Sequence, residues 1–260
     1  MSEPKQTAFP EPVVVWDLPL TPFTFAETLD AVDRLIASGR PHYFITANLH
    51  YAMLTASDPR LRTVNQEAAF LVADGKPLIL ASRRTCRPLP ERVTGADLVP
   101  ALCERAAIKG YGVFLLGGSP GVAEEAGRVL TARFPGLRIV GTEAPPFRPA
   151  TAEEHAALVA RIRQAGPDIL FVAFGQPKGE LWLAEHVNEL GVPACVQIGA
   201  SLDFVAGRVK RAPRLVQAAG MEWAWRIGTD PRRLGPRYAA DAAFAIKALL
   251  GRGRRSGRDR

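Results

Sequence analysis

Seven apolar runs of strand length alternate along the chain with segments that repeat apolar residues at helical spacing. The apolar runs occupy residues 13–18, 42–46, 68–74, 111–117, 137–142, 169–175 and 193–199. Helical patterns lie near residues 24–38, 48–57, 96–109, 121–134, 151–165 and 178–190. Continuous apolar strands joined by helices indicate a sheet that is covered on both faces. The pattern therefore predicts an α/β fold with a mainly parallel sheet and helices on both sides.

Five of the predicted strands end in small, polar or charged residues. These ends are Thr46 and Asn48, Asp74 and Gly75, Gly117 and Gly118, Gly175 through Glu180, and Gly199 through Asp203. Ligands of parallel α/β sheets bind beyond the carboxyl ends of the strands. We therefore expect the five ends to converge on one crevice.

The pattern changes after Gly207, where the chain becomes helical and basic and shows no further strand. Residues 208–260 carry 14 Lys or Arg against 4 Asp or Glu, whereas residues 1–207 carry 19 against 22. We predict an α/β catalytic core over residues 1–207, a basic helical appendage over 208–250 and a disordered tail over 251–260. Such an appendage suits nucleic acid, an anionic membrane surface or plain solvent.

Cysteines, histidines and the N-terminus narrow the class of protein. Three scattered cysteines without C-x-x-C spacing suit a reducing cytoplasm and argue against a disulfide framework or a zinc site. The opening MSEPKQTAFPEP lacks the apolar core of a signal peptide, and every apolar run is far shorter than the roughly 20 residues that span a bilayer. His42, His50, His155 and His186 show no metal-ligand spacing, so solvated or core histidines are expected.

Asp74 stands where the buried strand over 68–74 should leave the core. An unpaired buried charge is costly, so the carboxyl needs a specific role. It either caps the helix that follows or acts as a base that accepts a proton. The residues alone leave both interpretations open.

Glycine turns and cations near the strand ends suit an anionic ligand. Gly117 and Gly118 precede a helix whose N-terminal amides would attract a phosphate, and Pro177 and Lys178 begin a second helix in the same way. Arg92 lies just before a capped helix and could neutralise a diphosphate. The alternatives are tight strand-to-helix turns and ordinary surface charges.

Thr46 and Asn48 could hydrogen-bond a sugar or a nucleobase, although Asn48 could instead cap the next helix. The chain contains no D-x-D sequence, so cationic side chains and helix ends, rather than a metal ion, are expected to hold any diphosphate. The turn LLGGSPG lacks the G-x-G-x-x-G fingerprint of a nicotinamide-dependent oxidoreductase. A non-catalytic membrane- or nucleic-acid-binding module would explain the basic appendage but would give Asp74 no role.

Six stretches of the chain together carry a family resemblance. They are ITANLHYAMLTASDPRLR, FLVADGKPLIL, LPERVTGADL, GVFLLGGSPGVAEEA, FVAFGQPKGELW and IGASLDFVAGRVKRAPRLVQAAGMEWAWRIGTDPRRLGPRY, in that order. The set resembles the WecG/TagA/CpsF glycosyltransferases, which extend lipid-linked oligosaccharides in bacterial surface-polymer synthesis. The resemblance runs from about the second strand through Tyr238 and implies a Rossmann-like α/β fold.

The resemblance also implies a reaction. Family members move a sugar from a UDP-sugar to an undecaprenyl-diphosphate-linked saccharide, with inversion and without a required metal ion or other cofactor. The sugar is N-acetylmannosamine, its uronic acid or glucose, and the product is an exopolysaccharide or a cell-wall polymer. Asp74 matches the proposed base, Thr46 and Asn48 match strand-end residues that orient the reactants, and Arg92 matches an arginine that serves the diphosphate.

Further positions follow from the same motifs. The expected substrate-binding residues are Arg92, Gly95, Asp97, Gly117, Gly118, Gly175, Pro177, Lys178, Glu180 and Asp203. The residues expected near the membrane and the acceptor are Arg211, Arg214, Trp223, Arg226, Arg232, Arg233 and Arg237. We therefore expect a cytoplasmic protein that binds peripherally to the cytoplasmic face of the plasma membrane, with no nucleic-acid partner. The sequence is also compatible with a homo-oligomer.

The chain departs from the family pattern at Gly179. Family members usually have a glutamine before the glutamate of this motif, but here Gly179 precedes Glu180. The change removes an amide expected to hold the donor or the acceptor. A water molecule or another side chain could fill the gap.

Overall fold

The computed structural model describes residues 9–146, 148 and 150–251. A short antiparallel pair, β1 (Val13–Val15) and β2 (Leu18–Leu20), precedes the main sheet. The single strand expected over residues 13–18 is therefore a hairpin. Trp16 and Asp17 both have positive φ, and two such residues make the tight turn that reverses the chain.

The main sheet has six strands, all parallel, in the order β4-β3-β8-β7-β5-β6. The strands are β3 (Tyr43–Ala47), β4 (Leu71–Ala73), β5 (Gly112–Gly117), β6 (Arg138–Glu143), β7 (Ile169–Ala173) and β8 (Ala194–Gln197). Because every pair is parallel, all six carboxyl ends lie at one edge of the sheet. The parallel α/β architecture predicted from the apolar pattern is confirmed.

Alternate side chains of each strand enter two separate cores. On one face the sheet packs against α1 (Phe25–Ser38), α5 (Gly95–Lys109), α6 (Val122–Arg133) and the short α9 (Ser201–Val205). The other face is covered by α2 (Leu49–Ser57), α3 (Pro59–Glu67), α4 (Lys76–Ser82), α7 (Ala152–Ala165) and α8 (Lys178–Leu190). On β5, for example, Phe114 and Leu116 belong to one core, whereas Val113 and Leu115 belong to the other. Helices on both faces are thus confirmed.

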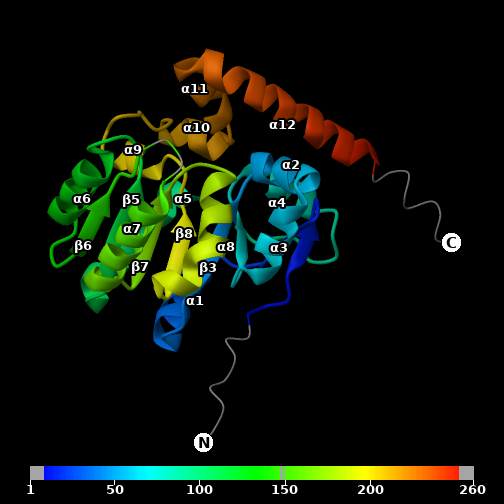
Figure 1. Ribbon diagram of the computed structural model, residues 1–260. Coiled ribbons are helices and arrows are strands. Elements are labelled where there is room, and N and C mark those ends of the chain that lie inside the picture. Colours follow the sequence, from blue (N-terminus) through cyan, green and yellow to red (C-terminus); the bar gives the residue numbers. More distant parts are fainter. Residues whose placement is uncertain (1–8, 147, 149, 252–260) are drawn as a thin grey trace, which may run out of the picture.

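The basic segment after residue 207 is helical, as predicted. It forms α10 (Arg214–Ala219), α11 (Glu222–Thr229) and α12 (Pro231–Gly251), which lie beyond the carboxyl ends of the strands (Figure 1). The tail predicted to be disordered begins at residue 251, and its residues 252–260 lie outside the described part of the chain.

An ion pair and a contact between aromatic rings are among the interactions that hold α12 against the core. The carboxylate of Asp241 lies 2.8 Å from Nδ1 of His50 on α2, and Asp241 is only 2% exposed. The ring of Phe244 meets Trp16 of the hairpin edge to face, with 5.9 Å between ring centroids. The last helix is therefore anchored at its middle, at one side of the sheet.

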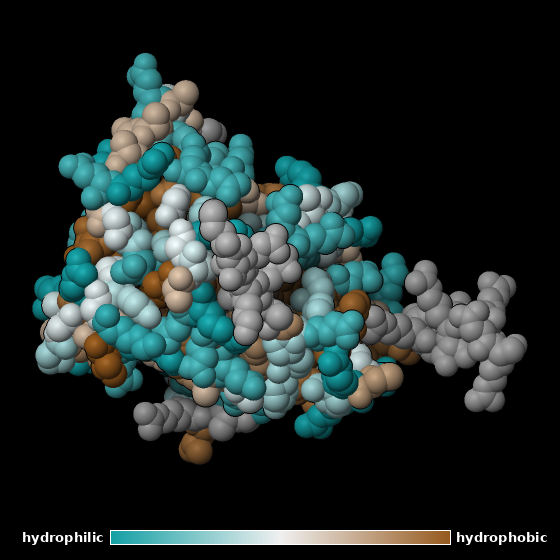
Figure 2. All heavy atoms as spheres, turned by 90° about the horizontal axis from the view of Figure 1, so that it is seen from below, coloured by the Kyte–Doolittle hydropathy of each residue, from teal (hydrophilic) through white to brown (hydrophobic). Residues whose placement is uncertain are grey.

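Among the described residues, none of the helices combines the length and the apolar character needed to cross a bilayer. Figure 2 views the molecule from below and shows hydrophobic residues interspersed among hydrophilic ones on that face. Several of the large hydrophobic side chains that are exposed to solvent belong to the appendage. These are Val209, Leu215, Met221, Trp223, Ile246, Leu249 and Leu250.

Candidate active site

Asp74 follows β4 directly and is held at the carboxyl edge of the sheet. Its backbone N–H donates to the carbonyl of Ala47 at 2.7 Å, which extends the pairing of β3 and β4 by one residue. Its Oδ2 accepts a hydrogen bond of 3.4 Å from the N–H of Gly95, the first residue of α5. The N-cap of the following helix, α4, is Gly75, and no side chain caps that helix. Asp74 therefore faces the start of α5 rather than capping α4.

Burial raises the pKa of Asp74 to about 6, well above its ordinary value. The nearby carboxylates of Glu222 and Asp97 raise this pKa further, whereas the amide of Gly95 and the guanidinium of Arg92 lower it. The carboxyl is thus ionised near neutral pH but binds a proton more strongly than an exposed aspartate. A group of this kind is suited to general base catalysis.

Four charged side chains of alternating sign form a cluster beside Asp74. Nη1 of Arg92 lies 2.5 Å from Oε2 of Glu222, and Nη1 of Arg211 lies 2.6 Å from Oδ1 of Asp97. The cluster is completed by contacts of 3.5 Å from Nε of Arg211 to Glu222 and 4.0 Å from Nη2 of Arg92 to Asp97. We call Arg92, Asp97, Arg211 and Glu222 the charge cluster.

The charge cluster joins the core to the appendage. Arg92 lies in the loop before α5 and Asp97 in its first turn, whereas Arg211 precedes α10 and Glu222 begins α11. The guanidinium of Arg211 is mostly buried, and its Nη2 makes no hydrogen bond with the described residues. A buried donor without a partner is costly, so this nitrogen offers a binding group to an anion that enters the site.

Thr46 and Asn48 both hydrogen-bond locally. The Thr46 hydroxyl, which is 6% exposed, donates to the carbonyl of Gln197 at 3.3 Å. Asn48 is the N-cap of α2, and its Oδ1 accepts a hydrogen bond from the N–H of Tyr51 at 3.0 Å. The capping interpretation of Asn48 is confirmed, and orientation of reactants by the two residues stays a prediction.

Gly117 and Gly118 form the turn expected after β5, with φ of 101° and 82°. A Cβ at Gly117 would lie 2.9 Å from the carbonyl oxygen of Ala173, so the end of β7 approaches too closely for any side chain. Gly121 then takes the N-cap position of α6 without a side-chain cap. The geometry fits the predicted tight turn, and phosphate binding there stays a prediction.

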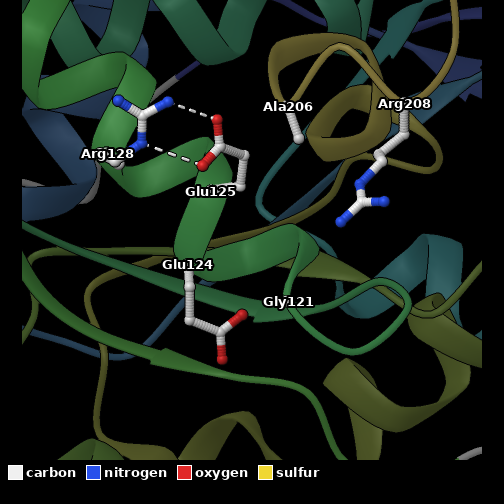
Figure 3. Close-up of a pocket in the computed structure, with 6 residues that line it drawn as sticks. All are labelled: Gly121, Glu124, Glu125, Arg128, Ala206 and Arg208. Atoms are coloured by element: carbon white, nitrogen blue, oxygen red, sulfur yellow. Dashed lines mark hydrogen bonds and ion pairs between the residues drawn. The ribbon is translucent and has the colours of Figure 1, made fainter.

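A cavity of about 470 Å³ lies beside the start of α6 (Figure 3). Its lining consists of Gly121, Glu124, Glu125, Arg128, Ala206 and Arg208. Figure 3 shows the ion pair between Glu125 and Arg128, in which the shortest distance is 2.6 Å. None of the residues predicted for the site lines this cavity. The two carboxylates in the first turn of α6 disfavour a further anion at that place.

The start of α8 holds a second carboxyl with a raised pKa. Glu180 is 1% exposed, and burial raises its pKa to about 7. Its Oε2 has no hydrogen-bond partner among the described residues.

The other residues predicted at the start of α8 form the turn that leads into the helix. Lys178 is exposed, with its ammonium 5.8 Å from the ring centroid of Phe174. The Gly175 turn has φ of 75°, and Pro177 takes the N-cap position.

Gln197 occupies the space next to Gly179. A Cβ built on Gly179 would lie 2.4 Å from Cγ and 2.9 Å from Cδ of Gln197, which is 3% exposed. Oε1 of Gln197 accepts a hydrogen bond of 2.7 Å from the N–H of Gly199. Gln197 of β8 thus occupies the space that a side chain at position 179 would enter.

The remaining predicted residues that the structure describes differ in their exposure and contacts. Asp203 is half-buried in α9, and its carbonyl accepts from the N–H of Arg208 at 2.9 Å. Trp223 is 47% exposed, and the guanidinium of Arg226 lies 5.9 Å from the ring centroid of Phe204. Arg232 is exposed and Arg237 is half-buried, whereas the side chains of Arg214 and Arg233 lie outside what the structure describes.

Two residues of the site were missed by sequence reasoning. Glu222 stands in the stretch MEWAWR, but its charge gave no sign that it pairs with Arg92. Gln197 lies in an apolar strand, where a lone amide signals only that it needs a partner. The glycine at position 179 was the one clue in the sequence to the position of Gln197, because a residue without a side chain leaves room for a neighbouring one.

A parallel sheet with helices on both faces, and with a buried carboxyl of raised pKa beside an arginine at its carboxyl edge, defines a protein of the α/β class, whose ligands bind beyond the strand ends. The chain matches the Glycosyl transferase WecG/TagA/CpsF family over residues 13–258, and it belongs to that family. The match takes in the α/β core and the helical appendage together. The protein is therefore a glycosyltransferase.

Proposed function

We propose that the protein transfers a sugar from a UDP-sugar to an undecaprenyl-diphosphate-linked saccharide in exopolysaccharide or cell-wall polymer synthesis. The acceptor hydroxyl oxygen forms a bond to the anomeric carbon as the bond from that carbon to the diphosphate oxygen breaks. UDP leaves with the electron pair, and the hydroxyl proton passes to Asp74. A single displacement of this kind inverts the anomeric centre.

The pKa and position of Asp74 carry the proposal. Its carboxyl lies at the strand edge where α/β enzymes bind their substrates, and its pKa of about 6 keeps it mostly ionised at neutral pH. A base must be deprotonated before the reaction and must then hold the proton, and a pKa near the working pH serves both needs.

Arg92 and Arg211 are proposed to stabilise the leaving diphosphate. The guanidinium of Arg92 lies close enough to Asp74 to lower its pKa, and both guanidiniums contact the carboxylate of Asp97. Nη2 of Arg211 has no hydrogen-bond partner among the described residues. Two positive charges at the diphosphate would supply the electrostatic stabilisation that the developing charge requires, with no need for a metal ion. Glu222 holds Arg92 at present, so the diphosphate must displace this carboxylate.

The appendage is proposed to place the enzyme on the cytoplasmic face of the membrane, where the lipid-linked acceptor resides. Leu215 and Trp223 are 86% and 47% exposed, and Leu250 near the end of α12 is 72% exposed. Arginines alternate with these apolar side chains along residues 208–250. Cations near anionic lipid contribute about 1 kcal/mol each, and tryptophan favours the headgroup level.

The reaction is tested by UDP release from UDP-N-acetylmannosamine, its uronic acid and UDP-glucose, with a short-chain lipid-diphosphate saccharide as acceptor. We expect acceptor-dependent release from one of the three donors. Asp74→Asn should reduce kcat by at least about 1000-fold while UDP affinity, measured by calorimetry, stays within a factor of about three. Near-normal turnover by this variant would remove the assignment of the base.

A matched control separates the base from a general loss of charge. Asp58→Asn changes an aspartate that caps α3 and pairs with Arg60, and neither of these residues belongs to the charge cluster. This control should retain the wild-type kcat. A truncation after Pro213 tests the appendage, because it keeps Arg211 but removes α10, α11 and α12. It should lower transfer far more than UDP affinity if the appendage presents the acceptor.

A further inference from the structure

Two helices on the face of the sheet opposite α1 bring three metal-ligating side chains together. His155 extends from α7, and His186 and Glu189 extend from α8 one turn apart. Nε2 of His155 lies 2.7 Å from Oε1 of Glu189, and Nδ1 of His186 lies 2.6 Å from the same oxygen. The two imidazole rings are tilted by 42°, with 4.2 Å between their centroids. None of these residues belongs to the charge cluster or its surroundings.

The ligand set is that of a divalent transition metal. Two imidazoles and one carboxylate are a common donor set for Zn²⁺, which leaves a fourth position for water. Ligand atoms bound to one tetrahedral Zn²⁺ are about 3.3 Å apart, since each metal–ligand bond is about 2.0–2.1 Å long. The three donor atoms already lie within 4.8 Å of one another, so small side-chain rotations would open the cluster around an ion.

The surroundings of the cluster also suit a metal. The side chains of His155 and His186 are 24% and 17% exposed, which leaves a path from solvent while packing limits their motion. Trp182 forms one wall, with its ring centroid 5.3 Å from that of His186. Oε2 of Glu185 lies 3.7 Å from Nε2 of His186. This distance is too long for a hydrogen bond. When Nδ1 of His186 binds a metal, Nε2 carries the proton, and Glu185 would have to move closer to accept it and fix that tautomer.

We propose that His155, His186 and Glu189 form a Zn²⁺ site that links α7 to α8. The glutamate now bridges the two histidines, and a bound ion would replace this bridge with three coordinate bonds. The linkage has a structural consequence for the rest of the protein, because α8 begins at Lys178 and carries Glu180 at the sheet edge. The ion would therefore hold the far half of that helix in place.

The test uses the full chain with no polyhistidine tag and titrates it with ZnCl₂ in a calorimeter. We expect one Zn²⁺ per chain, bound with a micromolar dissociation constant, and a rise in Tm of about 5 °C at saturating Zn²⁺. His155→Ala, His186→Ala and Glu189→Gln should each weaken binding at least tenfold. Circular dichroism of each variant establishes that it is folded.

Two control variants account for other ligands. His42→Ala removes a histidine outside the cluster, and Cys86→Ser removes an exposed thiol that could bind Zn²⁺ by itself. Both should bind Zn²⁺ as the wild type does. Failure of the wild type to bind Zn²⁺ below about 1 mM, or equal binding by the three ligand variants, overturns the proposal.

A spectroscopic measurement places the ion without relying on the ligand variants. Paramagnetic Co²⁺ in the same site would quench the fluorescence of Trp182, whose ring lies against both histidines. We expect saturable quenching in the wild type, and loss of this quenching in Trp182→Phe although calorimetry still detects Zn²⁺. Quenching that persists in Trp182→Phe would place the ion elsewhere and contradict the proposal.

Discussion

Nη1 of Arg92 lies 2.5 Å from Oε2 of Glu222, although the two residues are 130 positions apart in the chain. Arg92 belongs to the loop before α5, and Glu222 is the first residue of α11. Their ion pair thus closes the appendage onto the edge of the sheet next to Asp74. The carboxylate of Glu222 binds the same guanidinium of Arg92 that we propose binds the diphosphate. Binding of the diphosphate should therefore depend on the position of the appendage.

Glu222→Gln tests this coupling. Removal of the carboxylate frees Arg92, so UDP should bind more tightly, and it withdraws a negative charge that raises the pKa of Asp74. The pH midpoint of kcat/KM should therefore move to lower pH. UDP calorimetry and a pH profile of UDP release measure the two effects. Glu104→Gln, an exposed glutamate on α5, is the control and should change neither quantity.

The pH dependence of the wild type follows from Asp74. The carboxyl must be ionised to accept a proton, and its pKa in the folded protein is about 6. We expect kcat/KM to rise with pH and to level off above about pH 7, with a midpoint near 6. A profile that is flat between pH 5 and 7.5 would show that another group takes the proton.

Asp74 should also reduce stability at neutral pH. Its pKa is about 6 in the folded chain, whereas an unfolded aspartate has a pKa of about 3.9. Proton binding therefore favours the folded state below about pH 4, and this contribution is lost as the pH rises through 6. Asp74→Asn should raise the free energy of unfolding at pH 7.5 by on the order of 2 kcal/mol.

Urea unfolding at pH 7.5 and at pH 4 measures the gain in the free energy of unfolding of Asp74→Asn. The gain should vanish at pH 4. Asp58→Asn gives the comparison of opposite sign, because its hydrogen bonds with Arg60 lower the pKa of Asp58. That substitution should reduce stability at pH 7.5. A loss of stability in Asp74→Asn at neutral pH would contradict the raised pKa.

Most of the sheet could be predicted because its strands are continuous apolar runs. The strand expected over residues 111–117, for example, is β5 (Gly112–Gly117). The hairpin of β1 and β2 could not be predicted, because its turn has no glycine and Trp16 is an unusual residue at positive φ. Helix α3 is short and polar, so it carries little apolar pattern, although Asp58 and Pro59 mark its start.

The candidate site was predictable where its residues follow a strand or begin a helix. Asp74 directly follows β4, and Arg92 and Asp97 flank the start of α5. Contacts between distant segments leave no periodic signal in the sequence. Glu222 and Arg92 are one such pair, and His155 and His186 come together only because α7 packs beside α8.

Gly179 and Gln197 provide a test of packing at the site. A methyl group at position 179 would lie 2.4 Å from Cγ of Gln197, which is buried and cannot move freely. Gly179→Ala should therefore lower the free energy of unfolding by about 1–3 kcal/mol. Gln197→Ala should also destabilise the protein, because the N–H of Gly199 loses its acceptor.

The double variant distinguishes steric conflict from two independent losses. With Gln197 shortened to alanine, the methyl group at position 179 has room, so the double variant should be more stable than the sum of the single changes predicts. We expect a coupling of about 0.5–3 kcal/mol from urea unfolding of the four proteins. Strict additivity would mean that Gln197 does not occupy the space that a side chain at position 179 would enter.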